Sequence, residues 1–142
     1  MQNYQNHRRF RPVFHRILVP VIFLTVIGAG VNLAESWGDH ERLYNASLIL
    51  VLSMCVFGLA IYARVFALIA QDRAIRAEEN LRHYVLTGKP LDYRIGIRQV
   101  IALRFASDGE FPALAARAAA ENLTADAIKQ SIKTWRPDEH RV

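Results

Sequence analysis

Two long apolar runs without a charged residue dominate the sequence pattern. They cover residues 17–33 and 46–63, and a short polar segment lies between them. Each run is close to the ~20 residues that a helix needs to cross the hydrocarbon core of a bilayer. We therefore predict an all-α protein in which residues 13–86 form a two-helix transmembrane hairpin, with spans at about residues 14–34 and 44–66.

The second helix is predicted to continue beyond the membrane into the cytoplasm, to about residue 86. Residues 64–87 contain no proline or glycine, and a Thr-Gly pair at 87–88 followed by a proline is typical of a helix end. An acid four residues ahead of an arginine supports an exposed helix, and Glu78 with Arg82 has this spacing.

Residues 91–136 are predicted to form a small helical C-terminal cap in the cytoplasm, made of three short helices. The first helix covers about residues 92–106. Residues 1–12 form a basic N-terminal tail, and residues 137–142 form a polar C-terminal tail.

The boundaries of the second and third cap helices follow from capping signals. Ser107 and Glu110 have the spacing of a capping box at the start of the second helix. Thr124 is a candidate N-cap of the third helix. In that helix Ile128 and Trp135 would belong to one apolar stripe, which predicts a face packed against the rest of the cap.

Small residues recur along the second helix with the 3-4 spacing of a heptad. This spacing places them on one face, and in membranes such a face lets another helix approach closely. We interpret them as a helix-packing seam, although alanine is also the best helix former and occurs in any helix. The partner could be the first span, a second copy of the chain or another protein. The seam consists of Ala46, Ser53, Ala60, Ala63, Ala67, Ala70, Ala74 and Ala77.

The charge distribution predicts the orientation in the membrane. Residues 1–16 contain four arginines and no acid, whereas residues 34–45 contain three acids and one arginine. Basic flanks stay on the cytoplasmic side, so both termini are predicted to be cytoplasmic in a multi-pass protein. We expect the basic side chains to contact the head groups of anionic lipids. These lipid-contacting residues are Arg8, Arg9, Arg11, Arg16 and Arg64.

A cleaved signal peptide is the alternative interpretation of the first apolar run. Gly28, Ala29 and Gly30 fit a small-residue cleavage site after a basic start and an apolar core. The basic lead of 16 residues is long for a signal peptide, and Pro20 lies early in the apolar core. We therefore favour a retained span.

Candidate chemistry is sparse in this sequence. We predict no catalytic, cofactor-binding or metal site, because the five histidines are scattered and the motifs of nucleophilic or phosphate chemistry do not occur. Glu79 and His83 share a helix face, but two ligands do not make a zinc site. Cys55 in the second run is expected to be a small, inert packing residue.

Four stretches together resemble an uncharacterised family of small bacterial two-span membrane proteins, a domain of unknown function. They are NHRRFRPVFH at 6–15, ARVFALIAQDRAIRAEENLR at 63–82, IALRFASDGEFPAL at 101–114 and IKTWRPDEHRV at 132–142. The resemblance implies a protein of the bacterial inner (cytoplasmic) membrane with a cytoplasmic helical tail. It implies no activity, ligand or catalytic residue.

The function that these features favour is a non-enzymatic interaction, accessory or scaffold protein that packs through the seam. Its partners would be the lipid bilayer with its anionic lipids, and either further copies of the chain or an unidentified membrane protein. Two alternatives stay open: a small oligomeric channel or transporter, and a membrane-tethered regulator with a basic cytoplasmic domain. Binding to nucleic acid is not expected, because the excess positive charge lies beside the membrane.

Overall fold

The computed structural model describes Tyr4 and residues 13–137, and the regular elements in this part of the chain are helices. The chain divides into two compact units, with a boundary between Ala67 and Leu68. Of the described residues, 13–67 are called the hairpin unit, and 68–137 the cap unit. The elements are η1 (Val13–Leu18), α1 (Val19–Glu35), α2 (His40–Thr87), α3 (Ile97–Leu103), α4 (Phe111–Glu121) and α5 (Ala125–Ser131). The all-α prediction is confirmed.

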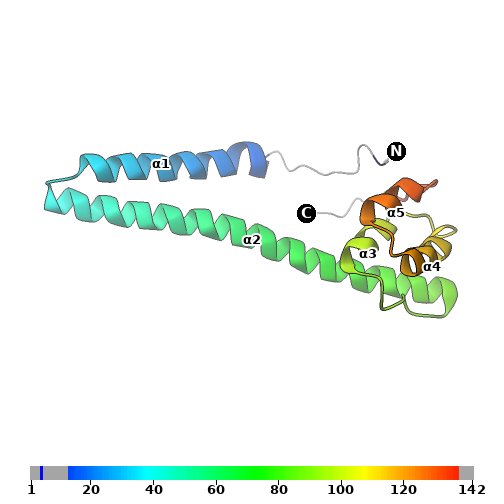
Figure 1. Cartoon of the computed structure of the whole chain (residues 1–142). Helices are drawn as coiled ribbons and strands as arrows, with labels where there is room; N and C mark the ends of the chain where they lie inside the picture. Colours follow the sequence, from blue (N-terminus) through cyan, green and yellow to red (C-terminus); the bar gives the residue numbers. More distant parts are fainter. Residues whose placement is uncertain (1–3, 5–12, 138–142) are drawn as a thin grey trace. The chain divides into compact units, whose positions relative to one another are not determined.

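The hairpin unit consists of η1, α1 and the part of α2 up to Ala67. The two long helices run side by side in opposite directions (Figure 1). The backbone N–H of Ser36 donates to the carbonyl of Asn32 at the end of α1 (3.1 Å), and Gly38 adopts a positive φ of 101° in the turn. The carboxylate of Asp39 then accepts the N–H of Arg42 (3.1 Å), which caps the start of α2.

Shielded side chains in the hairpin unit recur at heptad spacing on both helices. The spacing is typical of coiled-coil packing, in which the same face of each helix meets its neighbour along the whole contact. Ala29 and Ala46 are the most deeply buried, at 6% and 1% exposed. The buried and half-buried residues in these rows are Val19, Ile22, Val26, Ala29 and Leu33 on α1, Ser36 directly after it, and Leu43, Ala46, Leu50, Ser53, Phe57, Ala60, Arg64 and Ala67 on α2.

Pro20 shapes the first turns of the hairpin unit. It has no N–H and its ring clashes with the carbonyl of residue 16, so an α-helical turn cannot run through it undisturbed. The chain forms the wider π-helix η1 over Val13–Leu18, and α1 begins at Val19 with the proline in its first turn. The ring is therefore accommodated where a missing donor costs least.

Helix α2 spans 48 residues, His40–Thr87, and ends where the sequence predicts. Gly88 adopts a positive φ of 72°, and its N–H donates to the carbonyl of Tyr84 (2.7 Å). A left-handed glycine directly after the last helical residue is a common helix C-cap. The predicted stop signal at residues 87–88 is thus confirmed.

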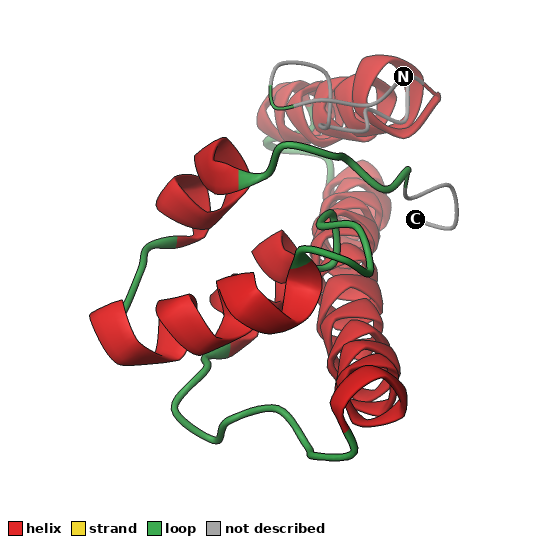
Figure 2. Cartoon of the chain, turned by 90° about the vertical axis from the view of Figure 1, so that its right-hand side faces the viewer, coloured by secondary structure: helices red, strands yellow, loops and turns green. Residues whose placement is uncertain are grey.

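The cap unit folds the three short helices against the last turns of α2 (Figure 2). Its core is apolar and is formed by side chains from all four helices and the connecting loops. Phe105 and Phe111 are the largest fully buried side chains. Ile75 is the residue of α2 that belongs to this core.

The capping signals in the cap unit have different outcomes. The hydroxyl of Thr124 accepts the N–H of Ala127 (3.1 Å), which confirms it as the N-cap of α5. The capping box of Ser107 and Glu110 is wrong, because α4 begins at Phe111 and the carboxylate of Glu110 has other partners. Its two oxygens accept the backbone N–H groups of Lys133 and Thr134, each at 3.1 Å.

The first and third cap helices are shorter than predicted. Helix α3 begins at Ile97, after Gly96, and ends at Leu103. Helix α5 ends at Ser131, so the chain is extended at Ile132. Trp135 pairs with Ala106 in an isolated antiparallel bridge, and its ring centroid lies 5.1 Å from that of Phe105. Trp135 therefore joins the apolar cluster, but from an extended strand of chain and not from a helical stripe.

Candidate functional site

The predicted seam has two environments in the structure. In the hairpin unit, Ala46 and Ser53 are buried, Ala60 and Ala67 are half-buried, and Ala63 is exposed. Four of these five residues thus belong to the shielded row of α2 inside the hairpin. Of these five seam residues, Ala63 is the one that is exposed on the surface of the hairpin unit.

In the cap unit, the remaining seam residues form an exposed face of α2. Ala70, Ala74 and Ala77 are exposed, and two large apolar residues continue their 4-3-4-3 spacing. Leu81 is 63% exposed and Tyr84 is 55% exposed. We call these five residues the Ala70–Tyr84 face. Leu81 and Tyr84 could have been identified in the sequence by extending the heptad spacing to large apolar residues.

The Ala70–Tyr84 face lies opposite the side of α2 that packs into the cap. The helix buries Ile75 and Glu79, at 8% and 6% exposed. At 3.6 residues per turn, these two positions lie about half a turn from the middle of the face. The five residues of the face are therefore exposed, and Ala77 at its edge also lines a groove between α2 and the loop before α3.

The predicted lipid-contacting arginines are only partly within the described chain. Arg8, Arg9 and Arg11 lie outside the described residues. Arg16 is exposed on η1, and Arg64 is half-buried on α2. The guanidinium carbon of Arg64 lies 6.0 Å from the ring centroid of Phe14, the distance of a weak cation–π contact.

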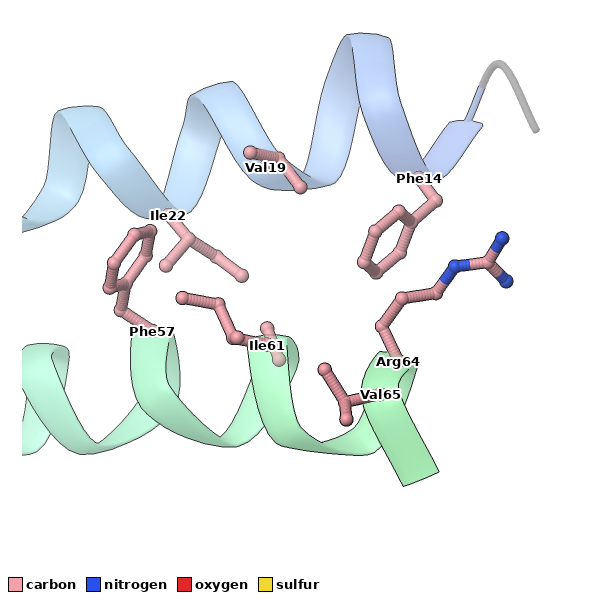
Figure 3. Close-up of a pocket in the computed structure, with 8 residues that line it drawn as sticks. Phe14, Val19, Ile22, Phe57, Ile61, Arg64 and Val65 are labelled. Carbon is pink, nitrogen blue, oxygen red and sulfur yellow. The ribbon is translucent and has the colours of Figure 1, made fainter. Parts of the chain in front are cut away.

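An apolar groove lies beside Arg64 in the hairpin unit (Figure 3). It has a volume of about 320 Å³, within the range of small-molecule pockets. Arg64 is the one charged residue among its lining residues and lies at the end formed by Phe14. The other lining residues are Phe14, Val19 and Ile22 from η1 and α1, and Phe57, Ala60, Ile61 and Val65 from α2.

A nearly buried ion-pair network joins α2 to the loop before α4. The guanidinium of Arg82 donates to Glu79 (2.9 Å), to Asp108 (2.7 Å from Nε) and to the carbonyl of Ala106 (2.7 Å). It also lies 4.5 Å from the ring centroid of Phe111. The predicted pairing of Arg82 with Glu78 is therefore wrong. Local spacing could not indicate Asp108, which is 26 residues away.

A second groove, of about 460 Å³, lies between α2 and the loop before α3. Arg73, Arg76 and Tyr93 contribute to its lining, and Tyr93 is 90% exposed. At its edge the carboxylate of Asp92 accepts bonds from the guanidinium of Arg94 (2.6 Å from Nη2) and from the Arg94 N–H (2.9 Å). These bonds lower the pKa of Asp92 to about 2.

His83 and Glu79 have separate structural roles. The Nδ1 atom of His83 lies 2.8 Å from the carbonyl oxygen of Lys89, and its ring meets the ring of Phe111 edge-on. Glu79 pairs with Arg82 and lies 3.7 Å from the guanidinium of Arg136. Among the residues that the structure describes, no group of three or more His, Cys, Asp or Glu side chains could hold a metal ion.

Cys55 is exposed on the outer surface of the hairpin unit. The expectation that it is a packing residue is wrong for contacts within the chain. Large apolar side chains beside it on the same surface are equally uncovered, for example Leu52, 65% exposed, and Leu59, 69% exposed. The thiol therefore lies on an exposed apolar surface of the hairpin unit.

The hydroxyl groups of the two apolar helices bond within their own helix. Thr25 donates to the carbonyl of Val21 (2.8 Å) and Ser53 to that of Ile49 (2.7 Å). Ser47 donates to the carbonyl of Tyr44 (2.7 Å). Each hydroxyl is satisfied without water or a partner helix.

These observations define a class: helical proteins with two helices long and apolar enough to cross a membrane, Val13–Glu35 and His40–Thr87, and a small helical cap unit. Residues 1–142 match the model of a family of unknown function, DUF6526. The chain belongs to this family, which confirms the resemblance of its sequence to a family without known activity. No curated protein and no solved structure matches the chain.

Proposed function

We propose that this chain is an integral membrane protein whose hairpin unit crosses the bilayer twice. The support is the exposure of its apolar helices. Only 6% of the most apolar stretch of Val13–Glu35 is buried, and 11% of that of His40–Thr87. The core helix of a water-soluble protein would bury most of such a stretch, because contiguous exposed apolar surface is unfavourable in water.

The internal hydrogen bonds of the hairpin agree with a hydrocarbon environment. In a bilayer every polar group needs a partner within the protein, and the hydroxyls of Thr25, Ser47 and Ser53 have one in their own helix. The basic residues 1–16 would then hold both ends of the hairpin on the cytoplasmic side of a bacterial inner membrane.

We further propose that the protein is a non-enzymatic interaction or accessory protein, which binds a partner through the Ala70–Tyr84 face. The single observation that carries this proposal is that the face combines strict heptad spacing, apolar character and exposure on the side of α2 away from the cap core. Small residues at its start permit close approach of a second helix, and Leu81 and Tyr84 supply apolar area at its end. The partner is a second copy of the chain or another membrane protein.

The experiment is the size and composition of the complex extracted from its native membrane in a mild detergent. Leucine at Ala70 and Ala77 fills the space that a second helix would occupy, so the double variant should lose the complex. Glu78→Leu is the matched control, because Glu78 is exposed on the same helix but beside the face. A complex of unchanged size in the double variant would refute this role of the face.

A further inference from the structure

The apolar groove of the hairpin unit has the chemistry of a site for one phospholipid molecule. Its walls are formed by side chains such as Phe14, Ile22, Phe57 and Ile61, and a guanidinium lies at one end (Figure 3). An acyl chain and a phosphate group, joined in one molecule, match this arrangement of an apolar wall and a single cation.

Arg64 places a positive charge at this end of the groove. Residues 1–34 and 42–71 contain no Asp or Glu, so the protein offers no acid in the neighbouring sequence on either helix. The guanidinium carbon of Arg64 lies 6.0 Å from the ring centroid of Phe14, a weak cation–π contact. A cation–π contact leaves the N–H groups at the edge of the guanidinium plane available, and these match two phosphate oxygens.

Space for the acyl chain arises from the way in which the two helices approach each other. Near the turn, Ala29 and Ala46 are almost completely buried against the opposite helix. At the start of α1 the ribbons of α1 and α2 lie further apart (Figure 1), and the groove of about 320 Å³ lies there. An elongated, flexible chain fills such a space without a rearrangement of the helices.

We infer that the hairpin unit binds one anionic phospholipid, with an acyl chain in this groove and its phosphate group on Arg64. The inference rests on the proposal that the hairpin crosses the membrane. It names a single bound lipid at a defined site, in addition to general contact with head groups. The positive charge of Arg16, which is exposed on η1 two residues after Phe14, favours an anionic over a zwitterionic head group at this end of the hairpin.

The test uses the full chain reconstituted with equal amounts of phosphatidylglycerol and phosphatidylcholine of identical acyl chains, followed by native mass spectrometry. The expected result is one retained phosphatidylglycerol per chain. Arg64→Gln should reduce the preference for phosphatidylglycerol over phosphatidylcholine about tenfold, the effect of losing one charge-assisted pairing. Arg64→Lys should retain part of the preference.

Two control variants separate the site from general effects on the protein. Arg42→Gln removes an exposed arginine at the other end of the hairpin unit and should leave the preference unchanged. Ile61→Trp fills the groove and should reduce retention of both lipids, whereas Leu59→Trp, on exposed surface outside the groove, should not. The two kinds of variant test the phosphate and the acyl chain separately.

Three results would overturn the inference. They are equal retention of both lipids by the unchanged protein, an Arg64→Gln variant with undiminished preference, and replacement of the retained lipid by added oleate, which would identify a fatty acid as the occupant. If the protein is integrated in the membrane but shows any of these results, only the lipid site fails. If the protein is not integrated in the membrane at all, the proposed function fails together with the site.

Discussion

Arg82 and Glu79 form a nearly buried ion pair, with 2.9 Å between Nη1 and Oε2 and with side chains that are 11% and 7% exposed. Their position on the last turns of α2 makes this pair the polar connection between the long helix and the loop that precedes α4, because Arg82 also binds Asp108 and the carbonyl of Ala106. The cap unit therefore depends on a charge on α2 as well as on the apolar core around Phe105 and Phe111.

Removal of Arg82 is expected to destabilise the cap unit strongly. Among the residues that the structure describes, Arg82→Ala leaves the buried carboxylate of Glu79 with the longer contact to Arg136, and breaking one side of a buried pair costs about 3–5 kcal/mol. The measurement is the free energy of unfolding of the cap unit by hydrogen exchange in the full chain. Arg117→Ala is the control, since its pair with Glu121 is exposed, and it should cost less than ~1 kcal/mol. Equal losses in both variants would contradict the role assigned to Arg82.

Glu110 is expected to hold the segment after α5 against the start of α4. Glu110→Ala removes the acceptor of two backbone N–H groups, and hydrogen bonds to a charged group are worth about 1.5–3 kcal/mol each. Hydrogen exchange should accelerate at the amides of Lys133 and Thr134 more than at those of α3. Glu121→Ala removes an exposed acid at the end of α4; it serves as the control and should leave these two amides protected.

The ion pair of Asp92 and Arg94 predicts a defined dependence on pH. The folded pKa of Asp92 is lowered to about 2 from a usual value near 3.8, so the pair contributes stability above pH ~4 that is lost as the pH falls through about 2. NMR titration of the side-chain carboxyl should place its midpoint near 2. Arg94→Gln should move the midpoint back towards the usual value, because the guanidinium is the main cause of the shift. A midpoint near 3.8 in the unchanged protein would contradict the observed bonding.

The sequence contains enough local information to predict the helices of this protein and some of their ends. The apolar runs predict the two long helices, Gly88 gives the end of α2, and Thr124 gives the start of α5. Signals of this kind depend on residues within one turn of each other, so they are readable without knowledge of the fold.

The interactions that assemble the cap unit could not be predicted in this way. Arg82 has an acid at the favourable spacing, Glu78, yet its partners are Glu79 and the distant Asp108. Glu110 has the spacing of a capping box with Ser107, yet it binds amides 23 and 24 residues away. For Glu110 contacts with a distant segment replaced the local pairing, and for Arg82 the distant Asp108 adds to a local pair with Glu79, because the folded cap offers these side chains additional partners.

Which residues of the seam are buried and which are exposed could not be predicted from the sequence. Its spacing was visible in the sequence, but the division between a shielded part with Ala46 and Ser53 and an exposed part with Ala70 and Ala77 depends on where α1 and the cap cover α2. Leu81 and Tyr84 are recognised as members of the Ala70–Tyr84 face by their exposure in the folded protein.

The most direct test of the membrane proposal uses Cys55, the single cysteine of the chain, which lies in the second apolar run and is exposed in the fold. In intact membranes we predict that a charged, membrane-impermeant maleimide does not label it, and that labelling appears after denaturation in detergent. Cysteine introduced at Trp37, in the turn of the hairpin and 82% exposed, in a Cys55→Ser background should be labelled from outside the cell. Labelling of Cys55 without denaturation, or recovery of the protein in the soluble fraction, would contradict the proposal that the hairpin crosses the membrane.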